Sequence, residues 1–177
     1  MLIVRLKSIA ATPLLRLAMG SIRGKTMQLR ENENQVDLHR MVVNQWIEAF
    51  NGHNVPAIVS LYADNAELYD SGMKRPRRGR TEIEQWFTTR FRTLSSITYT
   101  PASQLFTEDR AAVTWTTRGY GPRLLGQGWL SRPFQVDGVS IFHLVNGRIQ
   151  QQRGYYDHLS ALEQILPPLK WLLPRRL

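Results

Sequence analysis

Apolar residues along the chain change their spacing about halfway, from a helical period to an alternating one. Between residues 36 and 94 they recur every three or four positions, as on the buried face of an amphipathic helix. This spacing predicts three helices. The first begins at Val36, the second at Val55, and the third follows Thr81, whose side chain we expect to form a capping box with Glu84.

A short strand, Ala66–Asp70, is expected between the second and third helices. Side chains alternate along a strand, so Ala66, Leu68 and Asp70 share one face. An aspartate at the end of an apolar face is a candidate for a partly buried carboxyl group.

Extended segments fill most of the remaining chain. They predict four or five antiparallel strands, at Ile97–Phe106, Ala111–Tyr120, about 127–135, Val139–Val145 and Arg148–Tyr156. Asn146-Gly147 between the last two is the strongest short-range signal for a β-hairpin. A short helix carrying Leu159, Leu162 and Ile165 should follow. Helices first and a meandering sheet afterwards predict an α+β fold.

The charge of the chain is concentrated at its ends. The formal net charge is +9, and residues 1–30 hold six Lys/Arg and no acidic residue. Residues 31–169 are balanced, with 14 basic and 14 acidic residues. A neutral body argues against a nucleic-acid-binding domain, whose charge would line one face of the fold. The basic stretch 71–80 is expected to be a solvated loop, with a phosphate contact as the alternative.

These patterns divide the chain into three parts. Residues 1–35 are a basic extension, disordered or targeting, residues 36–166 are the folded domain, and residues 167–177 are a basic apolar tail. We expect a cytoplasmic protein, with organelle targeting by residues 1–30 as the alternative. No apolar run reaches the roughly 20 residues of a transmembrane segment. There is no cysteine, and the four histidines lack the spacing of metal ligands, so no metal is expected.

Two long segments together carry a family resemblance. WIEAFNGHNVPAIVSLYADNAELYDSGMKRPRRGRTEIEQWF and VSIFHLVNGRIQQQRGYYDHLSALEQI resemble, in order and spacing, the ketosteroid isomerase and SnoaL-like polyketide cyclase branch of the NTF2-like superfamily. The resemblance covers roughly residues 38–166. It implies a cone of three N-terminal helices packed on a strongly curved antiparallel sheet, with a pocket between them, often in a homodimer.

The resemblance to the isomerases implies a general base at Asp70, the position of the aspartate that ends the first strand in that family. Trp46 stands where the isomerases have a tyrosine that donates to the developing oxyanion, and Ser140 stands where they have a protonated aspartate. One such donor is typically worth about 10²–10³ in rate. With both donors changed, steroid isomerisation itself is not expected.

The resemblance to the cyclases implies a second carboxylate, because these relatives place their acid/base group on the closing strands. Asp157 is the nearest candidate, and Tyr156 matches an aromatic position that faces the pocket in the isomerases. The Gly119-Tyr120-Gly121 turn lacks the histidine of the cyclases. A dyad of His143 with Asp157 is excluded, because the two would lie about 26 Å apart along a regular hairpin.

We therefore expect an apolar small-molecule pocket and a cofactor-independent isomerase or aldol-type cyclase. Asp70 and Asp157 are the catalytic candidates, and an apolar wall should raise the pKa of Asp70. The expected substrate-binding residues are Trp46, Tyr62, Trp86, Trp115, Ser140, Phe142, Tyr155 and Tyr156. One alternative is a non-catalytic binding or dimerisation module. Another is an epoxide-hydrolase-like enzyme, which requires Arg118 or Arg153 between the two carboxylates.

Overall fold

The computed structural model describes residues 13–94, 96–121 and 132–165, and divides the chain into two compact units, Met1–Asn34 and Gln35–Leu177. The first described helix, α1, runs from Pro13 to Asn51. It thus begins well before Val36, where the sequence pattern placed its start. Apolar periodicity marks only the part of a helix that is buried, whereas most described side chains of residues 24–34 are exposed. A proline is compatible with the first turn of a helix.

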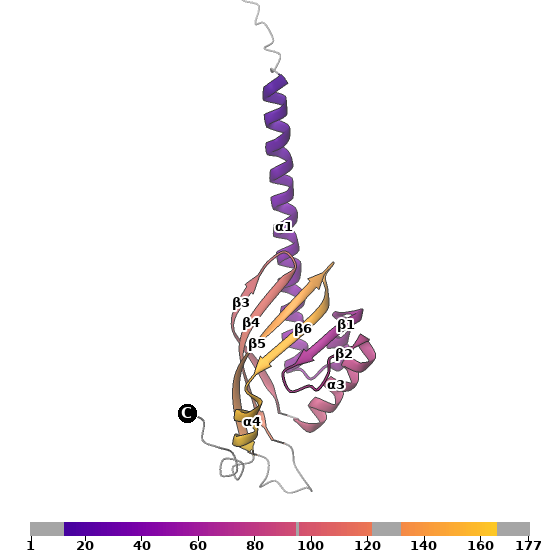
Figure 1. Cartoon of the computed structure of the whole chain (residues 1–177), viewed down its shortest axis with the longest axis vertical. Coiled ribbons are helices and arrows are strands. Elements are labelled where there is room, and N and C mark those ends of the chain that lie inside the picture. The colour runs from indigo at the N-terminus through magenta and orange to yellow at the C-terminus, as the bar shows by residue number, and fades with distance from the viewer. Residues whose placement is uncertain (1–12, 95, 122–131, 166–177) are drawn as a thin grey trace, which may run out of the picture. The chain divides into compact units, whose positions relative to one another are not determined.

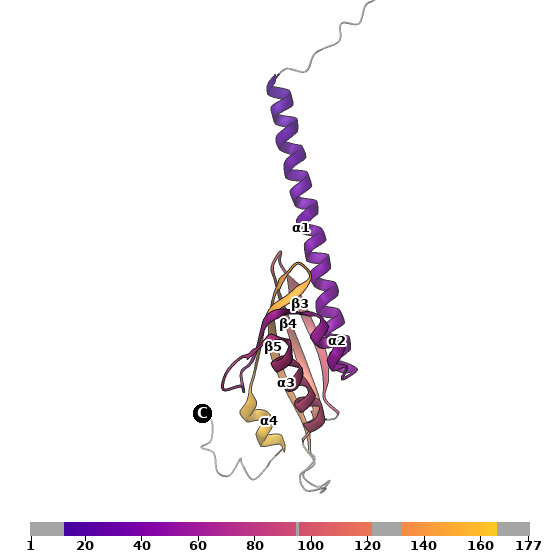
Figure 2. The ribbon, with the colours of Figure 1, turned by 90° about the vertical axis from the view of Figure 1, so that its right-hand side faces the viewer.

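The second unit is built around a curved, open sheet of six described strands (Figure 1). Its elements after α1 are α2 (Val55–Ser60), β1 (Tyr62–Asp70), β2 (Arg77–Arg78), α3 (Gly79–Thr93), β3 (Thr98–Phe106), β4 (Arg110–Tyr120), β5 (Pro133–Val145), β6 (Arg148–Tyr156) and α4 (His158–Ile165). The strand order is β2-β1-β6-β5-β4-β3. Figure 2 shows α2 and α3 along one face of this sheet. The predicted α+β fold, with N-terminal helices packed on a curved sheet, is confirmed.

The pairing of β1 with β6 is parallel, whereas the other strand pairs of the described sheet are antiparallel. Asp70 at the end of β1 lies beside Gly154 near the end of β6. Two parallel strands end at the same edge of a sheet. The residues that follow β1 and β6 are therefore brought together, although more than 80 positions separate them in the sequence.

Two elements differ from the sequence prediction in ways that have a local cause. β5 is one continuous strand, whereas the sequence predicted two strands with residues 136–138 between them. Residues 127–131 of the first expected strand lie outside the described residues. Gly138 lies opposite Trp115, and a Cβ at this glycine would be 2.5 Å from the indole, so the glycine makes room for a ring. The β5–β6 hairpin is confirmed: Asn146 and Gly147 have φ of 50° and 69°, as a tight two-residue turn requires.

The expected capping box at the start of α3 is wrong. The helix begins at Gly79, and the backbone N–H of Arg78 donates to the carboxylate of Glu82 rather than to Glu84. Arg75 donates two further hydrogen bonds to the same carboxylate, at 2.9 and 3.1 Å. These bonds hold the pKa of Glu82 down at about 2. The hydrogen bonds from Arg75 and Arg78 thus make Glu82, and not Glu84, the glutamate that caps α3.

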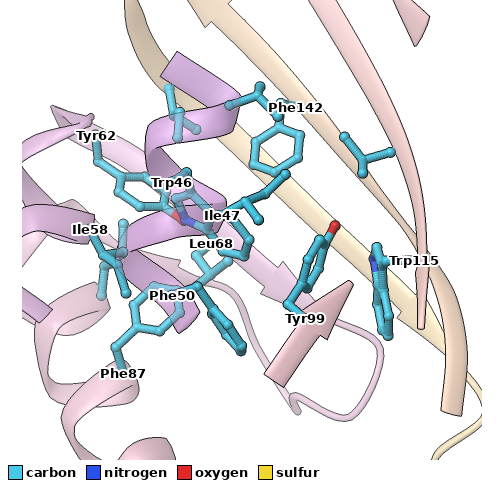
Figure 3. Packing of buried hydrophobic residues seen from close by; sticks show 14 of the residues in the cluster. Trp46, Ile47, Phe50, Ile58, Tyr62, Leu68, Phe87, Tyr99, Trp115 and Phe142 are labelled. Carbon is cyan, nitrogen blue, oxygen red and sulfur yellow. The ribbon is translucent and has the colours of Figure 1, made fainter. Parts of the chain in front are cut away.

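Aromatic rings fill the space between the helices and the sheet (Figure 3). Trp46 of α1 is packed against Phe50, Phe87, Tyr99 and Phe142, with ring centroids 5.3–6.2 Å apart. Its indole N–H donates to the hydroxyl of Tyr62 at 3.1 Å, and that hydroxyl donates to Gln152. This chain of hydrogen bonds satisfies three polar side chains inside the apolar core.

Candidate functional site

Asp70 lies at the wall of a small cavity between α1, α3 and the sheet. The cavity has a volume of about 40 Å³, enough for a few waters or one small functional group. Its lining is aromatic on the side of Trp46, Phe50 and Phe87. Its polar and charged groups are Asp70, Arg90 and three tyrosines (Tyr69, Tyr99 and Tyr156), beside Thr117, Ser140 and Gln152. Asp70 is only 13% exposed. The cavity therefore brings one largely buried carboxylate against an apolar wall.

Three groups stabilise the negative charge of the Asp70 carboxylate. The His158 Nε2 atom lies 3.2 Å from Asp70 Oδ1, and the guanidinium of Arg90 lies 3.7 Å from Oδ2. The backbone N–H of Gly72 donates to Oδ1 at 3.2 Å. Each of these contacts favours the ionised carboxylate.

The expected rise in the pKa of Asp70 is wrong in direction. Burial raises this pKa, as the apolar wall suggested, but the hydrogen bond with His158, the charge of Arg90 and the N–H of Gly72 together outweigh it. The pKa of Asp70 therefore lies below its ordinary value. At neutral pH the carboxylate is ionised and able to accept a proton.

His158 is held in place by its neighbours as well as by Asp70. Its Nε2 atom is 2.9 Å from the hydroxyl of Ser71, and its ring lies 3.9 Å from the ring of Tyr156. A Cβ at Gly72 would lie 2.2 Å from the same imidazole, so the ring packs directly over this glycine. The histidine at the first position of α4 thus joins the ends of β1 and β6.

The cavity brings together five of the eight side chains that the sequence assigned to substrate binding: Trp46, Trp86, Trp115, Ser140 and Tyr156. The indole N–H of Trp46, which replaces the isomerase tyrosine, is already donated to Tyr62. Ser140 accepts a hydrogen bond from the indole of Trp115 at 2.9 Å. Both changed positions therefore participate in hydrogen bonds within the protein.

The other three predicted substrate-binding residues do not line the cavity. Tyr62 and Phe142 are fully buried in the core and are not among the residues lining the cavity. Tyr155 is 39% exposed, because it alternates with Tyr156 along β6 and so points away from the cavity.

Asp157 does not line the cavity and is exposed. Its carboxylate accepts hydrogen bonds from the backbone N–H groups of Leu159 and Ser160, which caps the start of α4. Neither arginine of the epoxide-hydrolase alternative links it to Asp70. Arg118 donates to Gln135, and Arg153 lies 4.0 Å from Glu67.

His143 does not line this cavity either; the hairpin spacing excluded only its pairing with Asp157. His143 is 3.8 Å from Asp109 and 35% exposed. A histidine–aspartate pair does exist at the cavity, but it joins His158 to Asp70.

Sequence reasoning missed Arg90, Tyr99 and His158. Arg90 is one turn after Trp86 on α3, and its guanidinium lies 4.8 Å above the indole, so helical spacing could have placed it beside the cavity. His158 carries no local signal, because its proximity to Asp70 depends on the parallel β1–β6 pair.

Comparison with known proteins agrees with this architecture. Residues 43–152 match the SnoaL-like domain. The chain belongs to this family. No curated protein sequence matches the chain.

Solved structures of low sequence identity share the fold. A protein with a ketosteroid isomerase-like fold from Catenulispora acidiphila, in complex with trimethylamine, is 20% identical with a TM-score of 0.62, covering 70% of this chain and 90% of that one. IdmH from Streptomyces antibioticus, a candidate polyketide cyclase, is 20% identical with a TM-score of 0.60, covering 72% and 97%. SalBIII, an epoxide hydrolase/cyclase-like enzyme of salinomycin pyran-ring formation, is 19% identical with a TM-score of 0.60, covering 69% and 92%. At this identity they establish the fold alone.

Two further observations concern only the described part of the chain. It holds no group of three or more histidine and acidic side chains arranged to bind a metal ion. None of its helices is long and apolar enough to span a membrane. The tail 167–177 lies outside the described residues, and the domain limits and the homodimer stay predictions.

Proposed function

We propose that this SnoaL-like domain moves a proton next to a carbonyl group, as an isomerase or an aldol-type cyclase, with Asp70 as the general base. The observation that carries the proposal is the position of Asp70, a 13% exposed carboxylate at the wall of an aromatic cavity. A carbonyl compound whose reacting end enters this cavity would present its α-proton to an ionised base. No cofactor takes part in the proposed step.

Two phenols of the cavity wall are candidates to stabilise the resulting enolate. Burial raises the pKa of Tyr99 and also that of Tyr156, where the charge of Arg90 acts in the opposite direction. Both hydroxyls therefore keep their protons at neutral pH and can donate to an oxyanion. They would replace the two isomerase donors that have changed to Trp46 and Ser140.

The size of the cavity limits which part of a substrate it receives. About 40 Å³ accommodates a carbonyl group and its α-carbon but not a ring system. Small ketones are therefore the appropriate first probes, and the rest of a larger substrate would lie outside the cavity.

The test is deuterium exchange at the α-carbons of cyclopentanone and acetone, followed by NMR. A positioned general base contributes about 10²–10⁴ in rate, so Asp70→Asn should reduce protein-catalysed exchange by that factor. Asp157→Asn is the matched control, because this exposed carboxylate caps a helix and does not line the cavity. Exchange that persists in Asp70→Asn, or is lost equally in both variants, would remove Asp70 from the mechanism.

A second candidate function is a non-catalytic domain, and the contacts of His158 favour it. His158 lies within hydrogen-bond distance of Asp70 and Ser71 and so attaches α4 to the ends of β1 and β6. This structural role needs no substrate. The same exchange assay separates the two functions. A wild-type protein with no exchange above buffer, and with a large loss of stability in Asp70→Asn, would favour the structural role.

A further inference from the structure

A larger cleft lies along α3, beside the Asp70 cavity. Its volume is about 500 Å³, within the usual range for small-molecule sites. It is bounded by α3 on one side and by Arg75 and Arg77 on the other, and it shares Trp86 and Arg90 with the Asp70 cavity. The two hollows therefore adjoin through one indole and one guanidinium.

The charged residues that line the cleft, counted together with Asp70 behind Arg90, carry a surplus of one positive charge. Arg75, Arg77 and Arg90 line it together with one carboxylate, Glu82. Glu82 is satisfied by two hydrogen bonds from Arg75, and Arg90 faces Asp70 at 3.7 Å. Three guanidinium groups against two carboxylates leave +1, which suits a monoanion better than a doubly charged phosphate.

Two of these guanidinium groups have unused donors. The Nε atoms of Arg77 and Arg90 are buried and have no hydrogen-bond partner among the described residues. Arg77 makes no ion pair with any of the residues that the structure describes. Because these Nε atoms are closed to solvent, a carboxylate in the cleft would bind the terminal Nη atoms of Arg77, which have no hydrogen-bond acceptor among the described residues.

The wall beside these donors is flat and apolar. Trp86 is half-buried, with Arg90 above one face of its ring, and Leu94 extends the wall by two helical turns. A planar hydrocarbon ring packs well against an indole. The cleft thus combines a carboxylate-binding end with a surface for an aromatic body.

We propose that this cleft binds a planar aromatic carboxylate, with its carboxylate on Arg77 and Arg90 and its ring against Trp86. In a substrate of this class, the carbonyl-bearing end would reach the adjoining cavity and Asp70. This second part rests on the proposed function; the carboxylate binding does not. The substrate class is therefore an aromatic or polycyclic keto acid.

The test uses 2-naphthoate and its uncharged analogue 2-naphthamide, titrated into the ¹⁵N-labelled full chain. NMR follows the indole N–H of Trp86 and the Nε–H resonances of the arginines. Removing a hydrogen bond to a charged group costs about tenfold or more in affinity. Naphthoate should shift these resonances and bind about tenfold more tightly than naphthamide, and Arg77→Gln should abolish that difference.

Arg92→Gln is the matched control, because this exposed arginine of α3 does not line the cleft. It should leave the naphthoate affinity unchanged. Trp86→Ala is a second variant, which should weaken both ligands by a similar factor while the preference for naphthoate persists. Equal binding of the two ligands, or equal losses in Arg77→Gln and Arg92→Gln, would overturn the proposal.

Asp70→Asn distinguishes this proposal from the proposed function. The substitution removes the base, yet it frees Arg90 from its carboxylate, so naphthoate should bind as tightly as before or more tightly. Binding without any exchange activity would contradict the proposed function and keep the carboxylate site. Exchange activity without a preference for naphthoate would contradict the carboxylate site and keep the proposed function.

Discussion

Replacing His158 by phenylalanine tests how far this side chain controls Asp70. The variant keeps an aromatic ring against Tyr156 and removes the nitrogen that lies 3.2 Å from Asp70 and 2.9 Å from Ser71. A hydrogen bond to a charged group contributes about 1.5–3 kcal/mol, and His158 is 33% exposed, so we expect a loss of about 1–2 kcal/mol in the free energy of unfolding at pH 7.

The pH dependence of that loss is specific to the contact. The folded pKa of Asp70 is lower than its ordinary value, so the contribution is present above the unfolded pKa, near 4, and disappears as the pH falls through the folded value. Urea unfolding of wild type and His158→Phe should therefore differ at pH 7 and converge as the carboxylate protonates. The pKa of Asp70 should rise in the variant.

His143→Phe is the matched control, because His143 is as exposed as His158 and lies 3.8 Å from Asp109, an aspartate outside the cavity that is 55% exposed. It should change the unfolding free energy by less and leave the pKa of Asp70 unaltered. The reasoning is refuted if the stability difference between wild type and His158→Phe stays the same from pH 7 down through the titration of Asp70, or if the control matches it.

Three further predictions concern the core. Gly138→Ala should lower stability by about 1–3 kcal/mol in chemical denaturation, because the added Cβ meets an indole at 2.5 Å and a backbone oxygen at 2.7 Å; Gly154→Ala, with its nearest atom at 3.7 Å, should cost less. Tyr62→Phe should cost about 1–3 kcal/mol, because it leaves the buried indole N–H of Trp46 without its acceptor; an unchanged midpoint would contradict this. Burial lowers the pKa of His39, so protonation favours the unfolded chain and stability falls as the pH drops from about 6.5; His39→Leu should flatten that slope between pH 7 and 5.

Local signals in the sequence predicted the elements whose cause is local. The Asn146-Gly147 turn needs positive φ at two adjacent residues, and few other dipeptides accept it. The alternation of side chains also predicted that Asp70 shares a face of β1 with Ala66 and Leu68, although the strand begins at Tyr62 rather than at Ala66. By contrast, the sequence pattern placed residues 136–138 between two separate predicted strands, because a sequence does not reveal the indole of Trp115 that lies across from Gly138.

The candidate site was predicted in part for the same reason. Asp70 and Tyr156 were found through resemblance and position, but His158 was not, since its role depends on a parallel pairing of strands far apart in the chain. The direction of the pKa shift at Asp70 was wrong because burial alone was considered. The opposing charge of Arg90 comes from a helix whose orientation the sequence does not determine.

Arg90 lies between the cleft and the Asp70 cavity, so the two proposals are physically coupled. With the cleft empty, its guanidinium adds to the hydrogen bond from His158 in stabilising the ionised Asp70, and together they make it a weak base. A carboxylate bound on Arg90 would share that positive charge and place a negative charge nearby, and both effects raise a carboxyl pKa. A base acts best when its pKa approaches the working pH, so ligand binding would strengthen Asp70 as a base. The pKa of Asp70, read by NMR from its carboxyl carbon, should rise when 2-naphthoate binds but not with 2-naphthamide; a pKa that stays constant would separate the cleft from the reaction.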